Sequence, residues 1–384
     1  NKNKSVGGET TMSVKCQVVM EALDQLAPRS LAEHWDNVGL LLGNPAQDVN
    51  KLLVALDITS AVVEFAIANN FDMIVAHHPL IFKPIKNIRT DLPQGKMLSS
   101  LIKNDIAVFS LHTNLDIARG GINDLLAEKF QLQAVKPLTI SSVEDLTKLA
   151  VFVPQEHLEK VRTAICKAGA GQIGNYAECT FAVAGTGSFK PLDGTNPFIG
   201  NVNKLEQVAE YRLETIMPTK IVNKVLKALL KAHPYEEVAY DLYKLENTIN
   251  ENGLGRIGVL EKPLRMEKFL EKVKTLLKLQ NVRFVGNSDK IIKKVAICSG
   301  SGAEFIVKSA YQGADVIITG DVKYHEAQQA LENDINIIDA GHFGTEYHMA
   351  ELVAQYLKTK ADSAKWQLEK IEFDKISTDI FKFS

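Results

Sequence analysis

Short apolar runs alternate with amphipathic segments along most of the chain, which is the pattern of an α/β protein with buried strands. In the first part of the chain, strands are predicted at residues 52–56, 73–76 and 106–111, and helices at 14–27, 60–69, 96–103 and 123–130. The last part has the same order, with strands predicted at 295–298, 314–319 and 335–338 and helices at 302–312, 325–333 and 346–358.

The first and last parts also share short stretches of sequence. Residues 66–76 (A-I-A-N-N-F-D-M-I-V-A) parallel residues 310–319 (A-Y-Q-G-A-D-V-I-I-T), and the H-x-x-x-D motif that begins at His112 is echoed by H-x-x-x-E at His342. An internal repeat determines architecture. We therefore predict two related α/β lobes whose strand ends face one crevice; the alternative is chance identity between short segments.

The segment between these lobes has a different pattern. Strands are predicted at 149–153, 177–185, 212–216 and 237–245, and helices at 157–168 and 218–232. This β-α-β-β-α-β order is typical of a ferredoxin-like domain. We expect a disordered extension at 1–11, a core formed by 12–143 and 252–384, and an insertion at 144–251.

Composition narrows the class of protein. The net charge of −2 argues against a nucleic-acid partner, and solvated lysines are the commoner explanation of the basic cluster at 290–294. The four cysteines form no C-x-x-C motif and are interpreted as reduced thiols. No apolar run approaches the roughly 20 residues that span a bilayer. We therefore expect a cytoplasmic protein without a membrane segment.

Polar side chains with metal-binding chemistry follow several predicted strands. His77 and His78 follow one strand, His112 follows another, and His342 follows a third. The carboxyl ends of strands in an open α/β sheet are where ligands bind. Adjacent residues on a strand point to opposite faces, so both histidines of the pair can face one site only if the chain turns there, as Pro79 favours. The alternative is one core histidine and one surface histidine.

The predicted ligand set is larger than one metal ion needs. It offers three histidines and two carboxylates from among His77, His78, His112, Asp116, His342 and Glu346. One closed tetrahedral zinc site takes four ligands, so we expect two divalent ions about 3.5–4 Å apart, bridged by a carboxylate. Zinc is the first choice, with Mn, Fe, Co and Ni as alternatives, because the set is too rich in nitrogen for Ca or Mg. Such a pair acidifies a bound water, as in metal-assisted hydrolysis.

Three further residues are candidates for roles beside the metal. His112 is a ligand, an orienting partner of Asp116 or a proton shuttle, and we favour the orienting role. Asp321 either lies near the metal or caps a helix. His325, four residues later, either transfers protons or has a surface role.

Glycine-rich and proline-containing motifs give further hypotheses. Ser299, Gly300, Ser301 and Gly302 lie between a predicted strand and a helix, where backbone N–H groups bind phosphate, and the alternative is a plain tight turn. The G-L-G-R-I-G run at 253–258 lacks the strand and helix of a dinucleotide site. H-P-Y-E-E at 233–237 resembles a ligand set, but a structural turn is the preferred interpretation.

Five motifs together resemble one family. W-D-N-V-G-L-L-L-G, H-H-P-L-I-F, H-T-N-L-D-I-A-R-G-G-I-N, G-D-V-K-Y-H-E-A and G-H-F-G-T-E are similar to the signature segments of the NGG-interacting-factor-three-like (Nif-three-like) proteins, also called GTP cyclohydrolase 1 type 2 homologs. The resemblance implies two α/β lobes with a dinuclear metal site in the cleft, a toroidal homohexamer built as a trimer of dimers, and an insertion similar to PII and CutA domains that caps the ring.

The resemblance also implies roles for individual residues. The family's ligands fall on His77, His78, Asp116, His342 and Glu346, which leaves His112 as a neighbour of the ligands. The resemblance implies that Glu346 bridges, that His78 pairs with Asp116, and that His77 pairs with His342. The implied activity is that of a metal-dependent hydrolase acting on a nucleotide-like or phosphorylated small molecule, such as GTP. The alternative is a non-catalytic metal-binding or regulatory ring whose insertion binds an effector.

Overall fold

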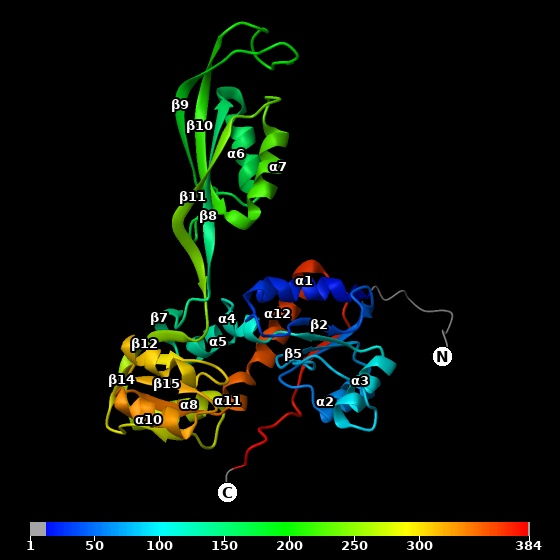
Figure 1. The fold of residues 1–384 in the computed structure, drawn as a ribbon, viewed down its shortest axis with the longest axis vertical. Helices are drawn as coiled ribbons and strands as arrows, with labels where there is room; N and C mark the ends of the chain where they lie inside the picture. Colours follow the sequence, from blue (N-terminus) through cyan, green and yellow to red (C-terminus); the bar gives the residue numbers. More distant parts are fainter. Residues whose placement is uncertain (1–12, 383–384) are drawn as a thin grey trace. The chain divides into compact units, whose positions relative to one another are not determined.

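The computed structural model describes residues 13–382 (Figure 1). The chain separates into two compact units, one formed by the segments up to Ser142 and from Asn252 onward, the other by Val143–Glu251. The extension predicted at 1–11 lies outside the described residues. Over the described range, none of the helices combines the length and the apolar character needed to cross a membrane.

The first sheet of the larger unit has five strands in the order β17-β4-β5-β6-β2. Its elements are β2 (Gly39–Leu42), β4 (Lys51–Ala55), β5 (Met73–Ala76), β6 (Ala107–Ser110) and β17 (Lys370–Phe373), with α1 (Cys16–Leu26), α2 (Ser60–Ala68), α3 (Pro93–Lys103) and α12 (Met349–Ala364). Side chains alternate between the faces. Leu52 and Val54 therefore pack with α1 and α12, whereas Leu53 and Ala55 pack with α2 and α3. The sheet is buried on both faces. β1 (Val14–Lys15) and β3 (Asp48–Val49) pair in a separate two-stranded ladder.

The second sheet has six strands in the order β13-β16-β15-β14-β12-β7. Its elements are β7 (Leu132–Pro137), β12 (Arg256–Arg265), β13 (Arg283–Val285), β14 (Ile291–Ile297), β15 (Val316–Thr319) and β16 (Asn336–Asp339), with α5 (Ile122–Lys129), α8 (Met266–Leu277), α9 (Ile306–Tyr311) and α10 (Tyr324–Glu332). Helices α9 and α10 cover one face, and α5 and α8 the other. Strands β14, β15 and β16 are parallel neighbours, as are β4, β5 and β6 in the first sheet. Each sheet thus contains the same three-strand arrangement.

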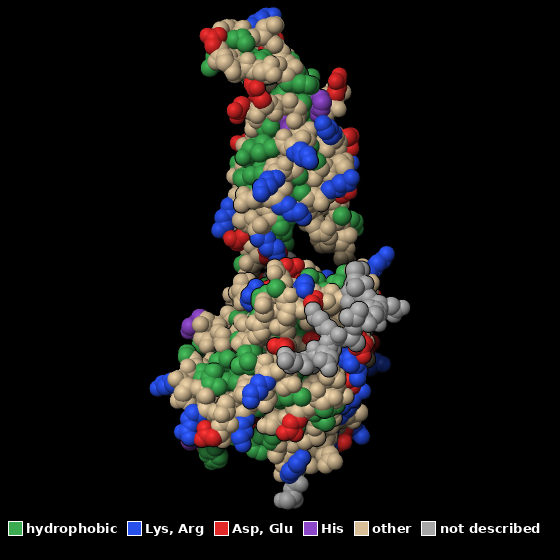
Figure 2. Space-filling model, turned by 90° about the vertical axis from the view of Figure 1, so that its right-hand side faces the viewer, with side chains coloured by type: hydrophobic (Ala, Val, Ile, Leu, Met, Phe, Trp, Pro, Cys, Tyr) green, Lys and Arg blue, Asp and Glu red, His purple; other side chains and the backbone are tan. Residues whose placement is uncertain are grey.

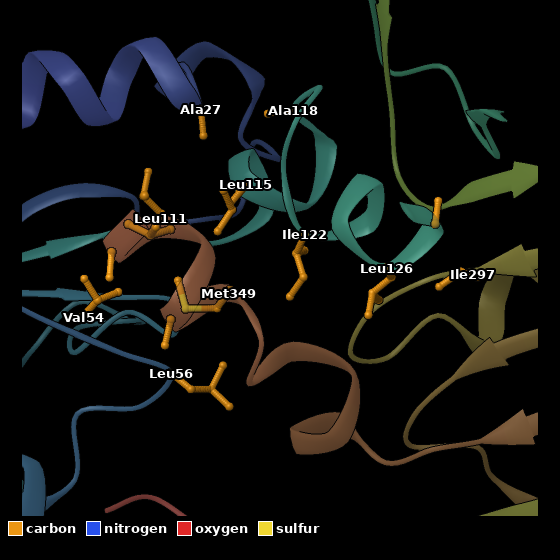
Figure 3. Close-up of a cluster of buried hydrophobic side chains, with 14 of the residues drawn as sticks. Ala27, Val54, Leu56, Leu111, Leu115, Ala118, Ile122, Leu126, Ile297 and Met349 are labelled. Atoms are coloured by element: carbon orange, nitrogen blue, oxygen red, sulfur yellow. The ribbon is translucent and has the colours of Figure 1, made fainter. Parts of the chain in front are cut away.

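One hydrophobic cluster joins the two sheets (Figure 3). Val54 contributes from the first sheet and Ile297 from the second, while Leu115 of α4 (Thr113–Ile117) and Leu126 of α5 lie between them. All four side chains are fully buried. The two sheets therefore share one core, which holds the ends of their strands in a fixed arrangement.

The second unit is built around a four-stranded antiparallel sheet in the order β11-β8-β10-β9. Its elements are β8 (Ser142–Pro154), α6 (Leu158–Lys167), β9 (Thr180–Phe189), β10 (Glu206–Pro218), α7 (Val222–Ala232) and β11 (Tyr240–Asn252), which is the predicted order of strands and helices. Val161 and Ile165 of α6 pack with Val225 and Leu229 of α7 in a separate core. Lys and Arg side chains lie on the face of this unit that Figure 2 shows.

Candidate metal centre

The site begins where the parallel strands of the larger unit end. In the first sheet, His77 follows β5 directly, and Asp57 and His112 lie two residues after β4 and β6. In the second sheet, Ser299 and Asp321 lie two residues after β14 and β15. Because parallel strands end at the same edge of a sheet, each sheet presents its polar side chains along one edge.

His342 and Glu346 are the first and last residues of the short helix α11 (His342–Glu346). The helical turn follows Gly341 directly. Residues four apart lie on the same face of a helix. The turn therefore brings the imidazole and the carboxylate together, with His342 Nε2 2.9 Å from Glu346 Oε2.

The first group of potential metal ligands consists of two imidazole nitrogens and one carboxylate oxygen. His78 Nε2 and His342 Nε2 lie 3.2 Å apart, and they lie 3.0 and 2.9 Å from Glu346 Oε2. Donor atoms bound to one ion at 2.0–2.1 Å lie roughly 3 to 3.5 Å from one another. These three residues therefore have the spacing of ligands to a common ion and could hold one.

A second group lies on the other oxygen of the same carboxylate. His77 Nε2 is 3.6 Å from Glu346 Oε1 and 3.7 Å from Asp116 Oδ1, and His77, Asp116 and Glu346 are all buried. The Nδ1–H of His77 donates to the carbonyl of Leu111 at 2.7 Å, so Nε2 carries the lone pair of the neutral ring. This buried Nε2 has no hydrogen-bond partner within the described chain. A cation would satisfy all three acceptors.

The structure brings the candidate ligands together in groups that differ from the predicted pairing. The structure groups His78 with His342 and His77 with Asp116, whereas the resemblance implied His78 with Asp116 and His77 with His342. The cause is the direction of the side chains after β5. His77 is fully buried, while His78 is partly exposed and contacts α11. Glu346 contacts both groups, which is the arrangement expected of a bridging residue.

Two of the histidines are oriented by hydrogen bonds from their Nδ1 atoms to aspartates. Asp57 Oδ1 accepts from His78 Nδ1 at 2.7 Å, and Asp321 Oδ2 accepts from His342 Nδ1 at 2.7 Å. A carboxylate can only accept, so the proton of each neutral imidazole is on Nδ1 and the lone pair of Nε2 faces the cluster. Asp321 is therefore close to the centre, and the N-cap of α10 is Lys323 instead.

His112 has the same kind of partner. Asp36, whose side chain is fully buried, accepts from His112 Nδ1 at 2.8 Å and from the hydroxyl and backbone N–H of Thr113. Burial disfavours the Asp36 carboxylate, but these hydrogen bonds lower its pKa to about 2. A nitrogen of His112 lies within 4.8 Å of ligand atoms of His77 and His78. This distance is compatible with both the predicted ligand role and the predicted orienting role.

Contacts within the cluster and burial shift the pKa values of its residues. Burial disfavours the charged form of His78, but contacts with Asp57 and Glu346 outweigh it and raise the pKa of His78 to about 10. Contact with Glu346 raises the pKa of His342 to about 9 against the opposing effect of burial. Burial raises the pKa of Asp116, whereas the surrounding histidines keep the pKa of Glu346 below its usual value despite its burial.

Comparison with known proteins assigns the chain to a family. The family model for Duf34/NIF3 (NGG1p interacting factor 3) matches residues 14–379. The chain belongs to the Duf34/NIF3 family. A Bacillus subtilis protein named GTP cyclohydrolase 1 type 2 homolog is 43% identical over 354 residues, which cover 92% of this chain and 95% of that protein.

Solved structures of the Duf34/NIF3 family have the same architecture. A Bacillus cereus protein related to NIF3 is 42% identical and superposes with a TM-score of 0.89, covering 97% of this chain and 100% of the other. Staphylococcus aureus protein SA1388 is 30% identical and superposes with a TM-score of 0.76, covering 97% and 99%. The predicted α/β fold class and family are thus confirmed.

The Ser299–Gly302 turn of this Duf34/NIF3 chain supports the cluster in a different way from the one predicted. The backbone N–H groups of Ser299, Gly300 and Gly302 donate to side chains of the protein, and the Ser299 hydroxyl donates to Asp116 Oδ1 at 3.1 Å. The donors needed to hold a phosphate are already in use, and Ser301 is exposed. We therefore do not propose that this turn binds phosphate.

Gly300 is required at this turn for a steric reason. It has a φ of +60°, and a Cβ placed on it would lie 2.1 Å from Glu346 Oε1. No L side chain can occupy that space without displacing the carboxylate. The glycine thus allows the backbone after β14 to approach the residue that contacts both ligand groups.

His325 does not belong to the cluster. It is exposed at the start of α10, where its ring packs against Tyr324 and its Nδ1 bonds Gln328 at 3.0 Å. The helix carries the side chain away from the strand ends, because His325 lies four residues beyond Asp321. The structure therefore gives no support to its predicted role in proton transfer.

Sequence reasoning missed Asp36 and Asp57 as site residues. Asp57 carried a usable signal, because it follows a predicted strand in the same way as His77 and His112 do. Asp36 was noted only as a part of the W-D-N-V-G motif. Its signal was weaker, because it lies in an irregular segment after η1 (Arg29–Leu31) and before β2.

Proposed function

We propose that the cluster binds two divalent metal ions bridged by Glu346, with His78 and His342 holding one ion and His77 and Asp116 the other. The observation that carries the proposal is that one buried carboxylate faces two groups of acceptors, a partly exposed pair of histidines on one oxygen and the buried His77 and Asp116 on the other side. Zinc suits imidazole and carboxylate ligands in this ratio, and Mn, Fe, Co and Ni are alternatives. Ions of this charge also offset the cost of burying two carboxylates.

A cavity beside the first group of ligands favours a reactive role of the metal ions over metal storage. It has a volume of about 640 Å³, and its lining includes His78 and His342. Pockets of about 300–1,000 Å³ hold small-molecule ligands. An ion held by these histidines would therefore be open to a substrate. Among the described residues that line the cavity, Arg283 and Lys382 are the only Lys or Arg and four are aspartates, so attraction for a phosphate would come chiefly from the ions.

Aromatic side chains beside His112 favour a nucleotide-like substrate. Trp35 and Phe82 are exposed, their rings contact each other at 5.9 Å, and each lies about 6 Å from the His112 ring. Such rings offer a surface on which a purine can stack. The B. subtilis relative is named as a homolog of a GTP cyclohydrolase. We therefore propose a metal-dependent hydrolase that acts on a nucleotide-like or phosphorylated small molecule.

The residues of the chain have separate parts in this reaction. When bound, two divalent ions supply a Lewis acid and lower the pKa of a water toward neutrality. Asp57 and Asp321 hold His78 and His342 in the tautomer that ligates. Asp36 does the same for His112, whose free Nε2 can accept and release a proton at the edge of the cluster. We also propose that six chains assemble into a ring, as the resemblance to the family implies.

Elemental analysis of the purified protein tests the proposal together with hydrolysis assays. We expect close to two divalent ions per chain, and turnover of GTP or a related phosphorylated compound that stops when a chelator removes the metal. Two ions without turnover of any such compound would favour the non-catalytic metal-binding or regulatory ring. A metal content near zero, even after zinc, manganese and iron are supplied, would refute the metal site itself.

Metal binding should release protons at neutral pH and strengthen as the pH rises. With pKa values of about 10 and 9, His78 and His342 are protonated at pH 7 in the metal-free chain, whereas a metal ligand must be neutral. Protons therefore compete with the metal below these values, and each displaced proton changes the apparent affinity by up to about tenfold per pH unit. Calorimetric zinc titrations in buffers of different ionisation enthalpy measure the release. Heats that do not depend on the buffer would contradict the prediction.

A further inference from the structure

A second cavity lies wholly within the Val143–Glu251 unit and has a volume of about 390 Å³. Its lining includes the end of β9, the loop that follows it, and Tyr235, Glu236 and Glu237 of the H-P-Y-E-E motif. The volume is in the range that small-molecule sites occupy.

Three aromatic rings form one wall of this cavity. The Tyr235 ring lies 5.9 Å from Phe189 and 6.3 Å from Phe198, measured between ring centroids. The ring planes are inclined by 60° and 51°, so the rings form a curved wall in place of a flat stack. The faces of aromatic rings carry partial negative charge and attract cations.

A buried carboxylate also lines this cavity. Glu210 is only 7% exposed, and the Tyr235 hydroxyl donates to its Oε1 at 2.8 Å. Among the described residues, no second side chain pairs with this carboxylate. Gly187 makes room for it, because a Cβ at that position would lie 2.0 Å from Glu210 Oε2. A buried carboxylate with one neutral hydrogen bond is costly unless a cation accompanies it.

The charge around the cavity has the same sign. Glu236 and Glu237 also line the cavity, and Lys190 is the only Lys or Arg in that part of its lining that the structure describes. A metal ion is a poor occupant, because no three His, Cys, Asp or Glu ligand atoms converge in the described part of this unit. An occupant must therefore be positively charged and apolar enough to lie against three rings.

The turn predicted for H-P-Y-E-E accounts for only part of the motif. His233 accepts from the backbone N–H of Tyr235 at 3.1 Å, and its Nε2 bonds the carbonyl of Phe152 at 3.0 Å. These bonds hold the turn. They do not explain why Tyr235 lies between two phenylalanines, nor why its hydroxyl pairs with Glu210.

We propose that this cavity binds a small organic cation whose alkylated ammonium group lies against Phe189, Tyr235 and Phe198, with Glu210 as its counter-charge. This site lies outside the metal cluster, and its occupancy does not depend on the proposed hydrolase activity. An insertion unit with its own ligand site would allow the level of a cationic metabolite to be sensed by the same chain.

Binding of choline and of its neutral isostere 3,3-dimethylbutan-1-ol to the full-length protein tests the proposal. Ligand-observed NMR or calorimetry should show saturable binding of choline and at least about tenfold weaker binding of the alcohol, since a desolvated cation–aromatic contact is worth that much. Tetramethylammonium and butylammonium extend the probe set. The proposal is overturned by equal affinity for choline and the alcohol, or by no saturable binding of any of the three cations.

Two pairs of variants identify the groups responsible. Glu210→Gln should lower choline affinity about tenfold or more, whereas Glu246→Gln, an exposed change on β11 outside the lining, should leave it unchanged. Phe198 and Phe181 are 54% and 66% exposed, so both can be replaced by alanine with little risk to folding. Only Phe198 lines the cavity, and only Phe198→Ala should weaken binding. Equal effects of the two alanine variants would refute the aromatic wall.

Discussion

Glu346→Gln should lose metal from both halves of the cluster at once. One carboxylate faces both groups, with Oε2 within 3.0 Å of His78 and His342 and Oε1 3.6 Å from His77. The glutamine amide keeps the shape but has only one acceptor atom, and its NH₂ group would point at nitrogen lone pairs. Loss of a residue behind a metal ligand costs about 10–100-fold in affinity. Loss of a ligand shared by two ions should cost more than that at both.

The measurement is metal content per chain after equilibration with buffered zinc, with two controls. Glu351→Gln changes an exposed residue on the following helix α12 and should retain the wild-type content. Asp321→Asn removes the partner of His342 Nδ1 alone, so it should weaken one ion and leave the other. A Glu346→Gln protein that retained one ion at full affinity would show that the carboxylate serves a single ion.

The residues of the cluster were predictable from the sequence, but their grouping was not. His77, His112 and His342 each follow an apolar run, and this position alone places them at strand ends. Which ligand pairs with which depends on side-chain directions that are determined by contacts between two sheets. Glu346 Oε1 and Oε2 face different histidines in a place where the carboxylate also lies against Gly300 of the second sheet. Spacing along the chain carries no information on such a contact.

Charged side chains that are buried and hold other parts of the fold in place were the hardest feature to predict from the sequence. Asp36 and Arg256 are charged residues in irregular or glycine-rich segments, where charge usually indicates exposure. The structure buries both side chains against hydrogen-bonding partners distant in the sequence, Asp36 with His112 and Arg256 with Asp124. The G-L-G-R-I-G run leads into strand β12, so its glycines serve this arginine and open no nucleotide-binding helix.

Arg256→Leu should destabilise the larger unit more than other single changes outside its apolar core. The side chain is 2% exposed, and all five of its N–H groups are used. Nε and Nη2 donate to the Asp124 carboxylate, and the remaining bonds are to backbone carbonyls of Ala118, Gly253 and Gly255 at 2.7–3.0 Å. Removal of one partner of a buried ion pair costs about 3–5 kcal/mol because it leaves an uncompensated charge. We expect a loss of this size in the free energy of unfolding.

The same strand supplies a matched control. Arg265 ends β12 as Arg256 begins it, but it is 59% exposed and pairs with the exposed Asp289, so Arg265→Leu should cost less than about 1 kcal/mol. Urea unfolding of the metal-free protein measures both variants without contributions from bound ions. The double variant Arg256→Leu/Asp124→Leu should recover part of the loss, since it removes the stranded carboxylate. Equal costs for the two arginines would mean that the buried guanidinium is not what joins the α4–α5 turn to β12.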